Sequence, residues 1–328
     1  MKSGSLAFFV PHKGCPFHCS FCDQNKITGQ QRVPTAEEVL RTAEEQAKHL
    51  GKRTSFTEIA FFGGSFTMID PIIMENLLKA AQTAVQQYEY KGVHLSTRPD
   101  GISDSMLRLL HRYGVTTIEL GAQSMNADVL RLNGRGHTPE QVEEASRAIH
   151  EYGFQLGLQM MTGLPGDSEE QARETCVKLY GLSPEYVRIY PTLVLPHTAL
   201  ARWFQEGNYQ PQTLEEAVSL CAELIVQFES HGCRVIRAGL HDETGVRVDH
   251  IAGPYHPAFG ELCRSRIFRN RLEARLQKAG TYHVHVAPQD LSLSVGQKKQ
   301  NVRYFEEKGY CIKLIADPLM KRGDFQIK

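Results

Sequence analysis

The chain has 328 residues, of which 41% are apolar and 23% are charged. This composition excludes collagen-like, intrinsically disordered and disulfide-scaffold proteins. No apolar run approaches the roughly 18 residues of a membrane span, and the first residues lack the pattern of a signal peptide. We therefore expect a cytoplasmic protein without a membrane partner. Its length fits one large α/β domain or a barrel with an appendage.

The charge is balanced overall but unevenly distributed. Lysine plus arginine and aspartate plus glutamate both number 37. Residues 251–328 hold 14 basic and 7 acidic side chains, net +7, and the remainder holds 23 and 30, net −7. A basic segment on an acidic body indicates a polyanionic partner. A solvated charged face explains the same bias equally well.

The eight cysteines are also distributed unevenly. Cys15, Cys19 and Cys22 lie within eight residues of each other. A tight cluster in a long chain of this kind indicates a metal or redox centre rather than a disulfide framework. The others are isolated, and we expect them to pack as small apolar residues; they are Cys176, Cys221, Cys233, Cys263 and Cys311.

Short β-favouring runs alternate with stretches of helical period through the first 240 residues. The predicted strands are Leu6–Pro11, Glu58–Phe62, Val93–Thr97, Thr117–Gly121, Leu156–Met160, Tyr186–Tyr190 and Arg234–Arg237. The predicted helices are 35–49, 70–89, 103–113, 139–152, 167–180 and 213–231. Thr35 with Glu38, and Thr138 with Gln141, predict capping boxes at two of these helices.

This alternation predicts parallel βαβ units with right-handed crossovers, in a barrel or an open doubly wound sheet. Six repeats and a seventh strand fall short of a full eight-fold barrel. We therefore predict an α/β fold, a partial (β/α)6 TIM-like barrel over residues 1–245. Residues 246–328 are predicted to form a small α+β C-terminal extension, with helices at 256–278 and 295–307 and strands at 282–286 and 312–315.

The cysteine cluster follows directly on the first predicted strand. A structural zinc site would need a fourth ligand, and because no second Cys-x-x-Cys occurs, that ligand would have to be a remote histidine. Three thiolates in a short loop fit three corners of an iron–sulfur cubane and leave one iron without a protein ligand. An open iron is what a substrate-binding cluster needs.

Cys15-x3-Cys19-x2-Cys22, with the aromatic Phe21 before the last cysteine, resembles the motif of the radical S-adenosylmethionine (SAM) enzymes. The resemblance implies that the three cysteines hold a [4Fe-4S] cluster. It implies that SAM chelates the open iron and is cleaved, after one-electron reduction, to a 5′-deoxyadenosyl radical. It also implies an electron donor such as flavodoxin or ferredoxin.

Two further strand ends carry candidate SAM contacts. Gly63 and Gly64 permit close approach of a ligand to the backbone, although a tight turn alone would explain them. Within the resemblance they and Ser65 match the glycine motif that binds the amino group of SAM. Glu119 and Gln123 end the fourth strand, and polar groups there are costly unless paired or used. The resemblance places them near the ribose and carboxylate of SAM.

Arg188 and Tyr190 lie at the end of the sixth strand. We expect them to point in alternate directions, with Arg188 reaching the cavity to contact SAM or substrate and Tyr190 packing elsewhere.

A longer series of motifs, spread over residues 5–240, resembles the radical SAM domain of the Elongator catalytic subunit, which modifies the wobble uridine of tRNA. A looser similarity extends to oxygen-independent coproporphyrinogen oxidase. The Elongator subunit has a wider first cysteine spacing and a C-terminal acetyltransferase domain, for which this chain has no room, so acetyl transfer is not implied. The motifs are Thr97-Arg98-Pro99-Asp100, 119–124, Asn133-Gly134-Arg135-Gly136-His137-Thr138, 163–166 and 188–194.

The resemblance therefore implies a radical SAM enzyme that modifies RNA, in particular tRNA. The alternatives are an enzyme acting on a tetrapyrrole or other small metabolite, and an iron–sulfur protein without radical chemistry. The basic run of the extension is the candidate RNA contact; it comprises Arg264, Arg266, Arg269, Arg271, Arg275, Lys278, Lys298, Lys299 and Arg303.

Overall fold

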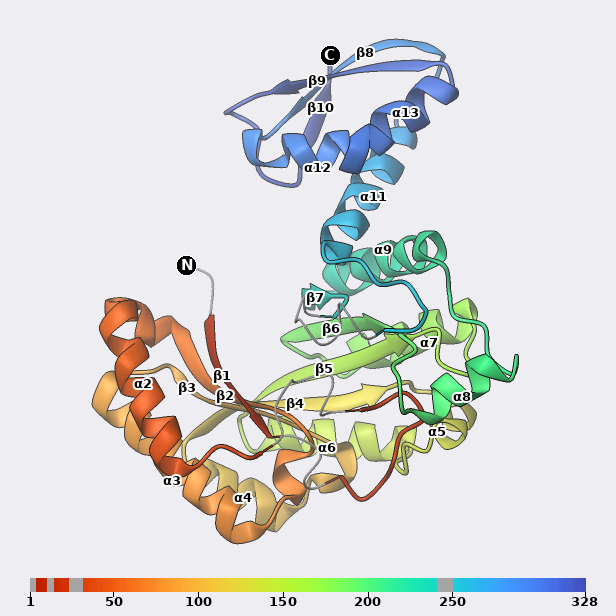
Figure 1. Ribbon diagram of the computed structural model, residues 1–328. Coiled ribbons are helices and arrows are strands. Elements are labelled where there is room, and N and C mark those ends of the chain that lie inside the picture. Colours follow the sequence, from red (N-terminus) through yellow and green to blue (C-terminus); the bar gives the residue numbers. More distant parts are fainter. Residues whose placement is uncertain (1–3, 11–14, 24–31, 241–249) are drawn as a thin grey trace.

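A computed structural model describes residues 4–10, 15–23, 32–240 and 250–328 (Figure 1). Seven strands form one parallel sheet in chain order, and the sheet curls into a half-barrel. The predicted partial barrel is confirmed. The strands are β1 (Gly4–Val10), β2 (Thr57–Gly63), β3 (Gly92–Thr97), β4 (Val115–Gln123), β5 (Gln155–Thr162), β6 (Tyr186–Pro191) and β7 (Arg234–Ala238).

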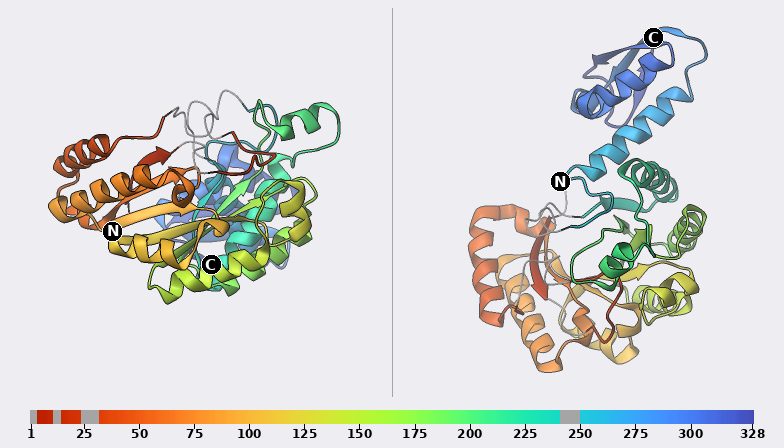
Figure 2. Two further views of the ribbon diagram at one scale, coloured as in Figure 1. Left: turned by 90° about the horizontal axis from the view of Figure 1, so that it is seen from below. Right: turned by 45° about the vertical axis from the view of Figure 1, so that its right-hand side comes forward.

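Helices cover the convex side of the sheet (Figure 2). All six predicted helices are present: α2 (Ala36–Leu50), α3 (Pro71–Tyr88), α4 (Asp104–Arg112), α6 (Pro139–Glu151), α7 (Glu169–Gly181) and α9 (Leu214–Ser230). Two short helices were not predicted, α5 (Ala127–Leu132) and α8 (Ala199–Gln205). Short 3₁₀ turns are η1 (Gly51–Phe56), η2 (Phe66–Met68), η3 (Pro99–Gly101), η4 (Pro288–Asp290) and η5 (Gln297–Lys299).

The predicted capping boxes fix the starts of α2 and α6. The Thr35 side chain accepts from the backbone N–H of Glu38, whose carboxylate accepts from Thr35 N–H in return. Thr138 and Gln141 make the same reciprocal pair. Each box satisfies backbone donors that the first helical turn leaves without partners.

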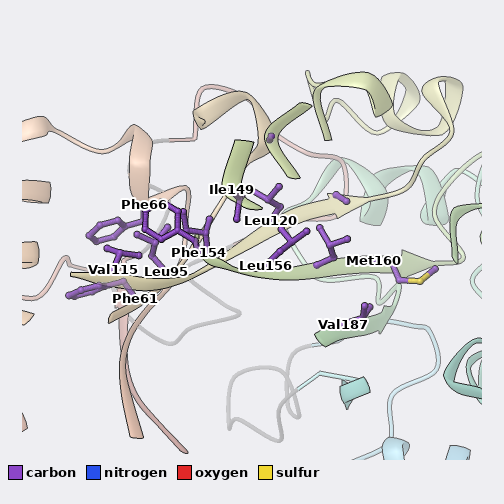
Figure 3. Packing of buried hydrophobic residues seen from close by; sticks show 14 of the residues in the cluster. Phe61, Phe66, Leu95, Val115, Leu120, Ile149, Phe154, Leu156, Met160 and Val187 are labelled. Atoms are coloured by element: carbon purple, nitrogen blue, oxygen red, sulfur yellow. The ribbon is translucent and has the colours of Figure 1, made fainter. Parts of the chain in front are cut away.

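The main core lies between the sheet and the helices. Side chains such as Phe61, Leu95, Leu120 and Val187 are fully buried there (Figure 3). Successive residues of a strand face opposite sides of a sheet, so their neighbours face the concave side. That side carries polar residues on several strands, including Glu58, His94 and Glu119, and it forms the wall of a cavity.

The C-terminal unit stands apart from the sheet, at the far end of α11 (Figure 1). Its strands pair in the order β10-β8-β9, parallel between β8 and β9 and antiparallel between β10 and β8. A separate core, with Val284, Val286 and Phe305 at its centre, holds it together. Its elements are α11 (Phe259–Glu273), β8 (Gly280–Val286), α12 (Leu291–Val295), α13 (Gln300–Glu307), β9 (Tyr310–Ala316) and β10 (Phe325–Ile327).

The predicted small α+β unit is confirmed, but its second helix is not continuous. Helix α12 ends at Val295, and Lys298 and Lys299, with φ of 50° and 61°, have a left-handed backbone that separates it from α13. The first predicted helix is shorter than expected, and β10 was not predicted. The predicted boundary between residues 245 and 246 lies outside the described residues.

Among the residues that the structure describes, no helix combines the length and apolar character that a bilayer crossing requires.

Candidate functional site

The concave side of the sheet encloses a cavity of about 1580 Å³, which extends from the cysteine loop toward the C-terminal unit. Parallel strands place their C-terminal ends at one edge of such a sheet, where barrel enzymes build their sites. All the predicted site residues line this one cavity: Cys15, Cys19, Cys22, Gly63, Gly64, Ser65, Glu119, Gln123 and Arg188.

The cysteine loop is anchored by the residues between its thiols. Ser20 donates its N–H to Asn133 O at 3.1 Å and its hydroxyl to Asn133 Oδ1 at 2.6 Å. Leu200 N–H donates to Ser20 O at 2.8 Å, and Phe21 is buried in a small core that includes Leu164. These contacts hold the loop in place, and all three cysteines line the cavity.

Cys15, Cys19 and Cys22 are half-buried. Within the described ranges, neither they nor other His, Cys, Asp or Glu side chains are already gathered into a metal-binding set of three. Burial raises the pKa of Cys15, although the Ser65 backbone N–H lowers it. Three thiols on one loop at one cavity wall fit a three-cysteine cluster in their chemistry.

The isolated cysteines behave as small apolar residues with one exception. Cys176, Cys221, Cys233 and Cys263 are buried, as predicted. Cys311 is exposed on β9, so the prediction is wrong there.

The segment from Asn133 to Thr138 packs on the cysteine loop, a role that its sequence did not reveal. Gly136 has φ of 72°, and a Cβ there would lie 2.4 Å from the ring of Phe17. The Arg98 guanidinium lies 4.8 Å from the centre of the same ring. The two glycines flanking Arg135 are the signal that marks such close packing.

Gly63 and Gly64 have different roles. Gly63 has φ of 111°, and a Cβ there would lie 2.9 Å from Val10 O. Gly64 donates its N–H to that oxygen at 2.7 Å. The turn therefore accounts for Gly63 without a ligand, while Gly64 is buried and lines the cavity. The Ser65 hydroxyl is already hydrogen-bonded to Thr97 Oγ1 at 2.8 Å.

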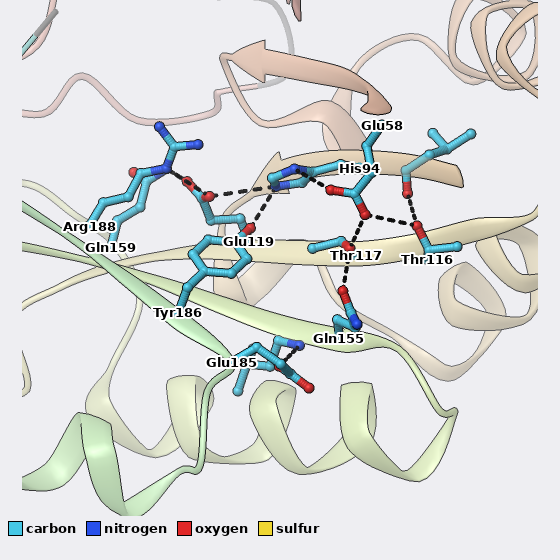
Figure 4. Close-up of polar contacts among 12 residues, drawn as sticks. Glu58, His94, Thr116, Thr117, Glu119, Gln155, Gln159, Glu185, Tyr186 and Arg188 are labelled. Carbon is cyan, nitrogen blue, oxygen red and sulfur yellow. Dashed lines mark hydrogen bonds and ion pairs between the residues drawn. The ribbon is translucent and has the colours of Figure 1, made fainter. Parts of the chain in front are cut away.

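Glu119 is fully buried at the centre of a polar network on the floor of the cavity (Figure 4). Arg188 Nε donates to Glu119 Oε2 at 3.0 Å, and Gln159 donates to Oε1. Burial alone would raise the pKa of the Glu119 carboxyl, but the nearby Arg188 charge and hydrogen bonds from His94 and Gln159 lower it to about 2. Side chains of the protein itself therefore satisfy the Glu119 carboxylate.

The network continues across the sheet to Glu58. His94 Nε2 lies 3.5 Å from Glu119 Oε2, and its Nδ1 lies 3.6 Å from Glu58 Oε2. Tyr186 OH is 2.8 Å from His94 Nε2, and Thr117 donates to Glu58 at 2.8 Å. These residues were not predicted as site residues. The signal was a polar side chain on the same face of neighbouring strands.

The expectation that Arg188 and Tyr190 point in alternate directions is wrong. Residues two apart on a strand share a face, and both side chains line the cavity. The Arg188 guanidinium lies 5.1 Å from the centre of the Phe62 ring.

Gln123 has φ of 65° beside an irregularity in the β4–β5 register, and its Oε1 has no hydrogen-bond partner among the described residues.

The basic run of the extension is only partly exposed. Arg266 and Arg269 are buried, the first paired with Glu215 and the second stacked on Tyr304. Arg264 donates to Glu229 at 2.6 Å, and so holds α11 against α9. The remaining basic side chains of the run are exposed; they are Arg271, Arg275, Lys278, Lys298, Lys299 and Arg303.

Comparison with known proteins matches the model of the radical SAM superfamily to residues 9–179 and the model of the Radical_SAM C-terminal domain to residues 184–269. A curated relative, the tRNA uridine(34) acetyltransferase of Dehalococcoides mccartyi, is 27% identical over 243 residues. The match covers 64% of this chain and 53% of that protein. The chain thus spans about half the length of this relative.

Two solved structures share the fold. Methanocaldococcus infernus Elp3, the archaeal relative, has a TM-score of 0.67 at 22% identity, with 83% of this chain and 64% of that chain covered. Escherichia coli coproporphyrinogen III oxidase has a TM-score of 0.50 at 18% identity, with 81% and 59% covered.

Proposed function

Since the chain belongs to the radical SAM superfamily of enzymes, we propose that Cys15, Cys19 and Cys22 hold a [4Fe-4S] cluster and that SAM binds beside it. The observation that carries this proposal is that the three thiols and the Gly64 turn line one cavity. Bound together, the cluster and SAM would supply one-electron cleavage of SAM to a 5′-deoxyadenosyl radical. The electron would come from a flavodoxin or a ferredoxin.

The chain's own residues would hold SAM in distinct ways. Gly64 has no side chain, so the methionine part of SAM could approach its backbone closely. The side-chain oxygen of Gln123, which has no hydrogen-bond partner among the described residues, offers an acceptor. Arg188 presents its guanidinium to the cavity because Glu119 fixes its Nε. Glu119 would therefore act through Arg188 rather than by direct contact, and Ser65 through its backbone rather than its engaged hydroxyl.

The proposed substrate is RNA, and tRNA in particular. The support is the curated relative, whose name places its action on tRNA uridine 34, together with the net charge of +7 over residues 251–328. Acetyl transfer is not part of the proposal, because the similarity covers only part of that relative. Action on a tetrapyrrole or another small metabolite is the outcome that would replace RNA.

Replacing Gly64 with valine should weaken SAM binding at least about tenfold while the iron content stays near that of the unmodified protein. The branched side chain would project into the cavity wall where a ligand backbone must approach, and tenfold corresponds to about 1.4 kcal/mol. Isothermal titration calorimetry on the anaerobic cluster protein measures this affinity. Gly181→Val is the matched control, because no described residue that packs against this helix end lies within 4 Å of a Cβ there. Equal affinity in the two variants would leave Gly64 as a turn residue only.

Binding of tRNA should weaken steeply between about 50 and 200 mM salt, since each neutralised phosphate releases counterions. The triple variant Lys298→Glu, Lys299→Glu and Arg303→Glu should lower the affinity and flatten this dependence. These side chains are exposed and make no ion pair within the described ranges. Filter binding across the salt series measures both quantities.

A barrel triple variant, Lys52→Glu, Arg112→Glu and Arg147→Glu, makes the same charge change on exposed positions of η1, α4 and α6. It should affect tRNA binding much less. Arg264 and Arg271 are unsuitable for reversal because they hold Glu229 and Gly323 O. Absent or salt-insensitive binding by the unmodified protein would remove RNA as the substrate and favour a small metabolite.

A further inference from the structure

Arg135 carries a positive charge directly behind the cysteine loop. Its side chain is only 7% exposed. No ion pair between Arg135 and a carboxylate occurs in the part of the chain that the structure describes. A buried guanidinium without an acidic partner is costly, so its surroundings must supply compensating acceptors.

Two acceptors meet the guanidinium from opposite sides. Nη2 donates to Gly121 O, on β4, at 2.6 Å. Nη1 donates to Cys19 Sγ at 3.3 Å. Arg98 in turn donates to the backbone oxygen of Arg135, and Nε of Arg135 has no partner among the described residues. The side chain is thus held between the sheet and one cysteine of the loop.

The backbone on both sides of Arg135 is fixed as well. Asn133 holds Ser20, next to Cys19, and Gly136 packs on the ring of Phe17. His137 Nε2 is hydrogen-bonded to Ala122 O at 3.1 Å. These contacts hold the backbone of Arg135 beside the cysteine loop, within reach of Cys19.

A neutral thiol is a weak acceptor, whereas a thiolate carries the negative charge that a buried guanidinium needs. Metal ligation deprotonates a coordinating thiol. Hydrogen bonds to ligating sulfurs set the reduction potential of an iron–sulfur cluster, because they stabilise the form with more negative charge. The contact is therefore best suited to a ligated Cys19.

We propose that Arg135 is a positioning residue that hydrogen-bonds the Cys19 sulfur when this cysteine is a cluster ligand, and that it thereby raises the reduction potential of the cluster. The inference rests on the proposed function, since it assumes that Cys19 binds the cluster. The Asn133–Thr138 segment would then supply the positive charge that faces the cysteine motif. Reduction by a weak one-electron donor would be easier with Arg135 than without it.

The first test compares Arg135→Gln, Arg135→Lys and the control Arg131→Gln. Arg131 lies at the end of the adjacent α5 and is 81% exposed in its side chain, and its one ion pair among the described residues is with exposed Asp128. Each protein is reconstituted anaerobically, its iron content is measured, and its cluster is titrated by electron paramagnetic resonance without SAM. Arg135→Gln should shift the midpoint potential to a more negative value, Arg135→Lys should shift it less, and Arg131→Gln should leave it unchanged. An unshifted potential in Arg135→Gln with full iron content overturns the proposal.

The second test uses the metal-free protein and does not depend on cluster assembly. Arg135→Gln is made in the unmodified chain and in a Cys19→Ala chain, and the free energy of unfolding in urea is measured for all four proteins. Because Arg135 Nη1 donates to Cys19 Sγ, Arg135→Gln should destabilise the Cys19→Ala chain less than it destabilises the unmodified chain. Equal losses of stability in the two chains overturn the contact. Unequal losses in a protein that takes up no iron would support the contact and instead contradict the cluster.

Discussion

Replacing Cys15, Cys19 or Cys22 with alanine is expected to abolish reductive cleavage of SAM. A [4Fe-4S] cluster with only two protein ligands loses one of the three corners that hold it, whereas the unmodified protein should bind about four irons per chain. The measurement is the 5′-deoxyadenosine formed on anaerobic reduction with dithionite, together with the iron content.

Cys176→Ala is the control for this experiment. Cys176 is fully buried on α7, and burial raises the pKa of its thiol to about 12. The thiolate that a metal ligand must provide therefore does not form readily at this residue. Its variant should keep both the iron and the cleavage activity. Full cleavage in Cys19→Ala would contradict the cluster assignment. A cluster that persists in the unmodified protein without SAM cleavage would instead indicate an iron–sulfur sensor.

Replacing Arg188 with methionine should destabilise the fold by about 3 to 5 kcal/mol. The change leaves the Glu119 carboxylate, which is fully buried, without the cation that lies 3.0 Å from it. The loss should diminish as the pH is lowered, because burial raises the pKa of an unpaired carboxyl and protonation removes the charge. Urea unfolding of the metal-free protein at several pH values measures the free energy of unfolding.

Two comparisons separate this effect from the loss of a large side chain. The double variant Arg188→Met with Glu119→Gln should be more stable than Arg188→Met alone, since the unpaired charge at position 119 is then removed. Arg131→Met breaks a pair of similar length, 2.8 Å, whose side chains are 81% and 85% exposed. It should change stability by less than about 1 kcal/mol. Equal losses in Arg188→Met and Arg131→Met would show that the buried pair contributes no more than a surface pair.

The strands and long helices of the barrel could be predicted because each carries a complete local signal. Strand β5 and helix α6 combine hydrophobic periodicity with punctuating residues such as Thr138 and Gly153. Helix α5 has only six residues, too few to establish a period, although Asn126 caps its first turn by accepting from two backbone N–H groups. Helix α8 has a similar signal in Thr198. The capping residues alone, without hydrophobic periodicity, indicate where both helices begin.

The cysteine motif, Gly64 and Gln123 could be located because they sit at predicted strand ends. The partners of these residues could not be predicted, because they depend on which side chains of neighbouring strands meet. Glu58, His94 and Glu119 come from three strands, and only the register brings them together. Likewise, Arg135 lies far from Cys19 in the sequence, and the Ser20–Asn133 hydrogen bonds and the packing of Gly136 on Phe17 bring the two together.

The basic run shows the opposite error. Charge alone predicted one exposed surface over residues 264–303, but helix α11 packs on both units and buries Arg266 and Arg269. An arginine on a helix buried from two sides can pair with a carboxylate or stack on an aromatic ring, as these do with Glu215 and Tyr304. These two arginines therefore interact with the protein itself and do not contribute to an exposed basic surface.

Helix α11 also belongs to two cores at once. Phe259 and Cys263, in its first half, complete the core of the barrel, while Phe268 and Leu272, in its second half, complete that of the C-terminal unit. The two units therefore share a structural element instead of a flexible tether, and their stabilities are coupled through it. A barrel truncated before α11 would lack Phe259 and Cys263 in its core, and a C-terminal fragment beginning after α11 would lack Phe268 and Leu272, so neither unit is a complete folding unit without this helix.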